Sequence, residues 1–177
     1  MVDLVIIVLL LLGILIGLKR GFILQIFHLF GFATALVVAT YYYDKLAPHL
    51  VLWVPYPELA NDSMWAHFLQ ALPLEKGYYN AIAFAIIFFA VRIGLQIIAS
   101  MLDFVAALPI LNSINRILGA LLGFIEIYLL IFIILFILAL TPLSFIQSWI
   151  NDSRIALMMI ENTPILSEKI KSLWFEL

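Results

Sequence analysis

The sequence predicts an all-α, polytopic membrane helical bundle with about four transmembrane helices and a C-terminal amphipathic helical tail. Of its 177 residues, 66% are hydrophobic and only 11% are charged, whereas soluble domains carry about 25% charged residues. This small number of charges cannot cover a water-soluble surface. The apolar excess must therefore face lipid or other helices. The apolar runs that approach the length of a bilayer span are residues 4–18, 22–43, 79–102 and 117–141.

The first two runs are separated by a very short basic turn. The first, residues 4–18, is slightly short for a hydrocarbon core of about 30 Å, so we expect Asp3 and Lys19 to lie at the two interfaces. It lacks the basic start and the cleavage site of a secretory signal, and we interpret it as a retained span. The second run closes in three consecutive tyrosines, Tyr41 to Tyr43, which are typical of an interfacial aromatic belt.

Residues 44–77 differ in character, because they contain four prolines and several acidic residues. Proline breaks helices, so we predict an extramembrane loop here. Trp53 and Trp65 suggest that parts of it lie against the bilayer surface, and we expect a short helix that begins at Asn61 or Asp62.

The third and fourth runs are joined by a polar turn at 112–116, which reads as a helix start. Thr141 and Pro142 end the fourth run, because proline cannot continue the helical hydrogen bonds. In residues 143–177 apolar and charged residues interleave. This pattern predicts an amphipathic helix, a break at Pro164 and a second short helix through Trp174.

Basic residues near the ends of the runs predict the orientation. Lys19 and Arg20 lie in the shortest turn, and Arg116 belongs to the same side. The positive-inside rule therefore places the Lys19-Arg20 turn in the cytoplasm and both termini outside. The opposite side spreads its basic residues over longer segments, at Lys45, Lys76 and Arg154.

Several classes of function have no support in the sequence. Cysteine is absent and the net charge is −2 without a clustered basic face, so we expect no disulfide, no thiolate metal site and no nucleic-acid partner. His28, His49 and His67 lack metal-ligand spacing, and no hydrolase elbow or phosphate-binding loop occurs. We predict a protein without enzymatic activity, cofactor or metal, and we interpret His28 as a structural, hydrogen-bonded residue.

Glycines recur every fourth residue in two of the spans. Small residues at this spacing share one helix face and let two helix backbones approach closely, although glycine is also simply common in membrane helices. We predict packing rows that hold a compact bundle or a homo-oligomer together, formed by Gly13, Gly17 and Gly21, and by Gly119 and Gly123.

The polar residues inside the spans need partners, because a charge near the bilayer centre costs about 2.5–3.5 kcal/mol on insertion scales. Arg92 and Gln96 share a face of the third span, and Glu126 is the one charge of the fourth. We hypothesise that Arg92 and Glu126 approach each other. The pair either lines a polar path or an oligomer contact, or is a structural ion pair, and an arginine that reaches the interface alone is a further alternative.

The chain resembles the bacterial colicin V production protein family. The likeness is carried by Asp3 before the first run, by Arg20-Gly21-Phe22 at the second, and by the start of the fourth, where Asn115-Arg116 precedes Gly119 and Gly123. Where family members commonly continue the glycine row with a basic residue and a glycine, this sequence has Glu126-Ile127.

The resemblance implies a multi-pass protein of the bacterial plasma membrane that supports toxin (bacteriocin) production and export, or envelope homeostasis. It supplies no reaction, ligand or catalytic residue. Three alternatives follow for the role of the chain: a structural membrane protein, a small channel or transporter with Arg92, Gln96, Glu126 and His28 along its path, and an accessory subunit of a larger membrane complex.

Overall fold

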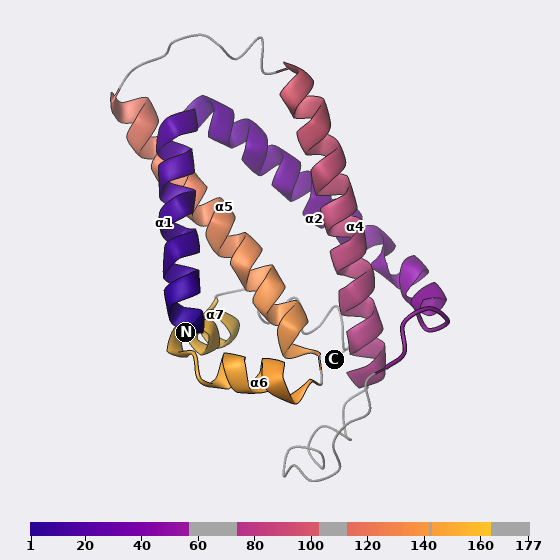
Figure 1. Cartoon of the computed structure of the whole chain (residues 1–177). Coiled ribbons are helices and arrows are strands. Elements are labelled where there is room, and N and C mark those ends of the chain that lie inside the picture. Colours follow the sequence, from indigo (N-terminus) through magenta and orange to yellow (C-terminus); the bar gives the residue numbers. More distant parts are fainter. Residues whose placement is uncertain (57–73, 103–112, 142, 164–177) are drawn as a thin grey trace.

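The computed structural model describes residues 1–56, 74–102, 113–141 and 143–163. All regular structure in these ranges is helical. The helices are α1 (Val2–Arg20), α2 (Phe22–Leu50), α4 (Leu74–Leu102), α5 (Ser113–Ala139), α6 (Ser144–Asn151) and α7 (Arg154–Asn162) (Figure 1). Four of them, α1, α2, α4 and α5, are long and apolar enough to cross a membrane, which confirms the predicted fold class.

The four long helices form two pairs. Helix α1 packs along α5, and α2 packs along α4, while α2 also crosses α5 and so joins the two pairs (Figure 1). Helix α4 makes few contacts with α5. The bundle therefore consists of two closely packed pairs that meet through α2.

The α2–α4 pair has an aromatic core. Phe32 and Phe88 are fully buried, and their rings meet edge to face with centroids 5.3 Å apart, an arrangement that aromatic rings favour. Ala35, Ala39 and Ala81 are buried beside them. Small side chains at these positions let the two helices close around the large rings.

The second helix is longer than the sequence predicted. It continues through Asp44 and Pro48 to Leu50, whereas the prediction placed a loop from residue 44. Pro48 removes one backbone hydrogen bond, but it lies in the last turn, where Ala47 is buried in a cluster with Tyr78 and Tyr79 of α4. The other end of the predicted loop is also shortened, since α4 begins at residue 74. Trp65 and the helix expected from Asn61 or Asp62 lie outside the described residues.

The tail forms two helices across the end of the bundle where α1 begins (Figure 1). Ser153 separates them, because its hydroxyl accepts a hydrogen bond from the Ala156 N–H at 3.1 Å and caps α7. Helix α6 buries Ile150 and exposes Phe145 and Trp149, as an amphipathic helix does. The break predicted at Pro164 and the helix through Trp174 lie outside the described residues.

Helix α5 ends at Ala139, two residues before the end of the predicted span at 141. The Gln147 amide donates to the carbonyls of Ala139 and Thr141 at 2.8 and 2.9 Å. These bonds satisfy carbonyl groups that the end of the helix leaves without partners. The Gln147 side chain, which comes from α6, thus fixes the turn that follows α5.

Candidate functional site

The two glycine rows lie face to face in the α1–α5 pair. A methyl group on Gly17 would stand 2.8 Å from the carbonyl carbon of Gly119 and 3.0 Å from Cα of Ala120, and one on Gly123 would stand 2.9 Å from Cα of Gly17. No side chain fits at these distances, which are well inside van der Waals contact. The contact is backbone against backbone, within one chain.

The row continues one turn further in altered form. A methyl group on Gly13 would stand 2.7 Å from Cγ1 of Ile127. Helix α1 therefore leaves room for the isoleucine that this chain carries where a glycine would continue the row. Close helix contact persists because the glycine is on the opposite helix.

The turn between α1 and α2 depends on Gly21 and Asn115. Gly21 has a φ of 80°, a left-handed conformation that glycine adopts without steric cost. The Asn115 side chain fills the space beside it and accepts a hydrogen bond from the Phe22 N–H at 3.1 Å. Phe22 opens α2, so an α5 residue caps the start of α2.

Asp3 has the same role at the other end of the bundle. Its Oδ1 accepts hydrogen bonds from the Ser153 hydroxyl at 2.5 Å and from the Ile155 N–H at 3.0 Å. These groups open α7, where the helix dipole also favours a negative charge. Asp3 thereby ties the start of α1 to the tail.

The basic residues of the family-like motifs, Arg20 and Arg116, are not among the groups that form these contacts in the described part of the chain. Arg20 is half-buried, and Arg116 is exposed. The hydrogen bond between Phe22 and Asn115 brings their two segments to the same end of the bundle.

A polar cluster lies between α2, α4 and α5. Glu126 is buried on α5, and its two carboxylate oxygens accept hydrogen bonds from Arg92 of α4 and Gln25 of α2. Arg92 also donates to the backbone carbonyl of His28 at 2.8 Å, and its guanidinium carbon lies 5.5 Å from the centre of the Phe32 ring. The Arg92 side chain is 20% exposed and that of Glu126 5%.

This arrangement compensates the charges inside the spans. The ion pair hypothesised between Arg92 and Glu126 is present, and amide and carbonyl groups from α2 complete it. Such pairing lowers the cost of placing charges in an apolar environment. Since α4 and α5 otherwise touch little, the ion pair is a principal link between them.

The other polar candidates lie differently. Gln96 is exposed and takes no part in the cluster, although it is one turn from Arg92. His28 contributes its backbone carbonyl. Gln25 was not among the predicted site residues, because a lone glutamine on a span gives no sign of a partner far along the chain. Its Oε1 is buried and has no hydrogen-bond partner among the described residues.

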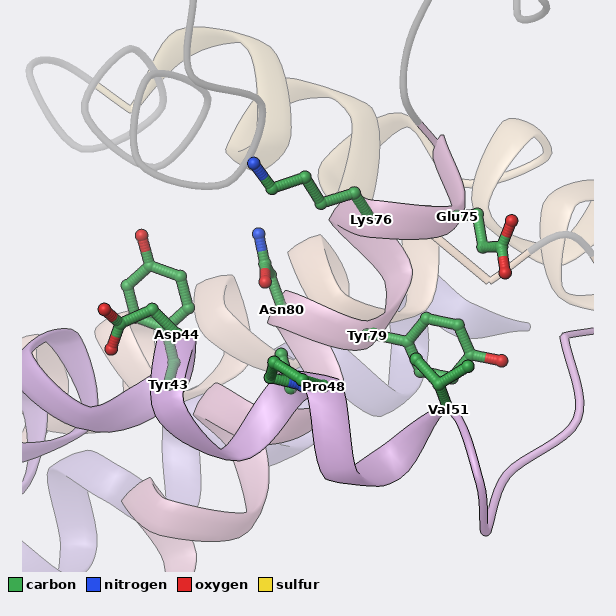
Figure 2. A pocket seen from close by; sticks show the side chains of 9 residues that line it. Tyr43, Asp44, Pro48, Val51, Glu75, Lys76, Tyr79 and Asn80 are labelled. Atoms are coloured by element: carbon green, nitrogen blue, oxygen red, sulfur yellow. The ribbon is translucent and has the colours of Figure 1, made fainter.

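A hollow of about 460 Å³ lies between the end of α2 and the start of α4. Figure 2 shows Lys76 and Asn80 of α4 reaching over it, opposite Tyr43 and Asp44 of α2. The sequence placed most of this lining in the predicted loop 44–77, and only Tyr43, Tyr79 and Asn80 in the spans on either side, so it could not predict that two helix walls face each other. The full lining is Tyr43, Asp44, Ala47, Pro48, Val51, Glu75, Lys76, Tyr79 and Asn80.

A tyrosine cluster closes one side of this region. The Tyr79 hydroxyl donates to the carbonyl of Val54 at 2.8 Å, and the rings of Tyr56 and Tyr78 meet edge to face at 5.3 Å. Burial, followed by the negative charge of Glu75, raises the pKa of the Tyr56 phenol. These contacts fix the segment after α2 against α4.

No group of three or more histidine, cysteine or acidic side chains gathers within the described ranges in a way that could hold a metal ion.

Comparison with known proteins adds two likenesses. Residues 2–164 match the family described as "Colicin V production protein". A Bacillus subtilis (strain 168) protein described as "Uncharacterized transmembrane protein YshB" is 41% identical over 174 residues, which cover 98% of this chain and 97% of the relative. No solved structure matches the chain.

Proposed function

Because the chain belongs to the colicin V production protein family, we propose that it is a non-enzymatic protein of the bacterial plasma membrane that supports toxin (bacteriocin) production and export or envelope homeostasis. Its role is structural: it forms a rigid helical unit for a larger membrane assembly and does not conduct ions or solutes.

The observation that carries this proposal is the compensated polar cluster. Arg92 of α4 and Gln25 of α2 both donate hydrogen bonds to Glu126 of α5. A transport path needs polar groups that bind a passing ion or solute and release it. Charges that neutralise each other, and that link two helices with few other contacts, fit a structural role better.

The residues of the family-like motifs support the same proposal. Asp3 and Asn115 accept hydrogen bonds from the starts of distant helices, and Gly17, Gly119 and Gly123 allow the closest backbone contact. Both glycine rows are engaged within one chain. A homo-oligomer or a contact with a partner subunit would therefore use another face.

The proposed orientation keeps the Lys19-Arg20 turn in the cytoplasm and the termini outside. The fold supports this grouping, because the hydrogen bond from Phe22 to Asn115 joins the two segments that carry Lys19, Arg20 and Arg116.

Flux through reconstituted liposomes tests the proposal. The purified full chain should give no flux of protons, Na⁺, K⁺ or Cl⁻ above that of protein-free vesicles. The proposal would be wrong if the wild-type protein conducts and both Arg92→Ala and Glu126→Ala abolish this flux. The exposed-site control Arg116→Ala should then keep the flux, and the protein would be a channel.

Complementation of a deletion strain gives the matching test in cells, with survival under envelope stress and toxin export as readouts. The uncharged double variant Arg92→Met/Glu126→Met should complement if it folds, because a structural link does not require charge. Loss of complementation by this variant, when it is folded and as abundant as the wild type, would contradict the proposal.

A further inference from the structure

The hollow between α2 and α4 lies beside side chains that are typical of a membrane interface. Just beyond α2, Leu52 and Trp53 are 85% and 84% exposed, and Tyr41 on α2 is 73% exposed. Exposed aromatic rings at the end of an apolar span mark the level of the lipid headgroups. The hollow therefore opens where headgroups lie.

Its walls carry charges of both signs on different helices. Asp44 comes from α2, and Lys76 reaches over the hollow from α4 (Figure 2). Glu75 is a second acid in the lining, so the described residues of the hollow carry two carboxylates and one ammonium group. A purely anionic ligand would meet a net negative wall, whereas a ligand with both a phosphate and an ammonium group has a partner for each charge.

The hollow also has the size and the apolar surface for such a ligand. Its volume of about 460 Å³ falls within the roughly 300–1,000 Å³ of small-molecule sites. Ala47, Pro48 and Val51 supply an apolar wall. Asn80, which is 5% exposed, adds a side-chain amide at the edge of this wall.

We propose that this hollow binds the headgroup of an amine-bearing zwitterionic phospholipid, of the phosphatidylethanolamine class. The phosphate faces Lys76 and Asn80, and the ammonium group faces Asp44. A primary ammonium has N–H groups that a carboxylate accepts as charge-assisted hydrogen bonds, whereas a choline headgroup has none. The acyl chains leave past the exposed apolar side chains of the interface. The site is separate from the polar cluster and independent of the role proposed above.

Binding of short-chain lipids to the full chain in detergent tests the proposal. The probes are dihexanoyl phosphatidylethanolamine, phosphatidylcholine and phosphatidylglycerol, with soluble O-phosphoethanolamine as competitor, and the measurement is the dissociation constant from calorimetric titration. We expect phosphatidylethanolamine to bind about tenfold or more tightly than the other two lipids, since one charge-assisted hydrogen bond is worth about that factor.

The variants Asp44→Asn and Lys76→Gln should each weaken this binding about tenfold. The matched control is Lys45→Gln, which alters a neighbouring exposed lysine that does not line the hollow. Equal effects of all three variants would overturn the site.

The wild-type selectivity decides the question even where a variant fails to fold. Equal affinity for phosphatidylcholine, or tighter binding of phosphatidylglycerol, would overturn the zwitterionic headgroup. If O-phosphoethanolamine, at the same concentration as the lipid, fully prevents lipid binding, the ligand is a soluble zwitterion and not a lipid. This result would overturn the proposal as well.

Discussion

Substitution of Gly17 by alanine tests the backbone contact between α1 and α5. The added methyl group would stand 2.8 Å from the carbonyl carbon of Gly119 and 3.0 Å from Cα of Ala120, whereas carbon atoms prefer about 3.5–4.0 Å. Both neighbours are backbone atoms, which cannot rotate away as a side chain can. The helices must therefore move apart by roughly half an ångström or more, along the whole contact.

The magnitude follows from two opposing terms. Extra methyl groups in a well-packed interior cost about 1–3 kcal/mol, and the rigid backbone favours the upper end of this range. Alanine in place of glycine gains up to about 1 kcal/mol of helix propensity. Gly17→Ala should therefore destabilise the protein by about 1–2 kcal/mol.

Gly94→Ala on α4 is the matched control, because a methyl group there meets nothing within 4 Å. Only the propensity term applies, so this variant should be unchanged or more stable by up to about 1 kcal/mol. Reversible unfolding in mixed micelles, followed by circular dichroism, measures both variants. If Gly17→Ala is as stable as Gly94→Ala, the two glycine rows do not pack as described.

The remaining predictions concern the polar links. Single replacement of Arg92 or Glu126 by methionine should destabilise the fold by about 3 kcal/mol, and the double variant by clearly less, because one unpaired charge is worse than none; additive losses in the unfolding cycle would contradict the coupling. Asn115→Ala should cost about 1 kcal/mol through loss of the cap on α2, and retention of full stability in the same assay would contradict it. Asp3→Ala should speed hydrogen exchange at the start of α7, which the exposed-site control Asp152→Ala should not do; equal exchange in both variants would remove the capping role.

Composition and run length were enough to predict four helical spans, because lipid requires about 20 apolar residues per crossing. They could not predict how far each helix extends. The end of α2 is an example: proline and acidic residues suggested a loop from residue 44, but packing of Ala47 against α4 holds the helix to Leu50. Tertiary contact outweighs local propensity there, and no local pattern reports it.

The candidate site could be predicted only in part, for a related reason. A charge inside a span is costly without a compensating partner, so this cost was enough to raise the hypothesis that Arg92 pairs with Glu126. A neutral amide makes a weaker demand than a charge does, and the sequence does not show which residue it meets. Gln25 is therefore recognised as a member of the cluster only once α2 is seen to cross α5.

The position of Asp3 shows what the family-like motifs encode. Read locally, an aspartate before an apolar run is an interfacial residue, and its function ends there. In the fold its carboxylate accepts hydrogen bonds from the first residues of α7, as Asn115 does for α2. Each of these residues links two segments that are distant in sequence, so the motifs specify how the helices pack together. The family-like motifs therefore identify the arrangement of the helices and not a binding or catalytic site. The site that we propose for a ligand, the charged hollow between α2 and α4, lies outside these motifs.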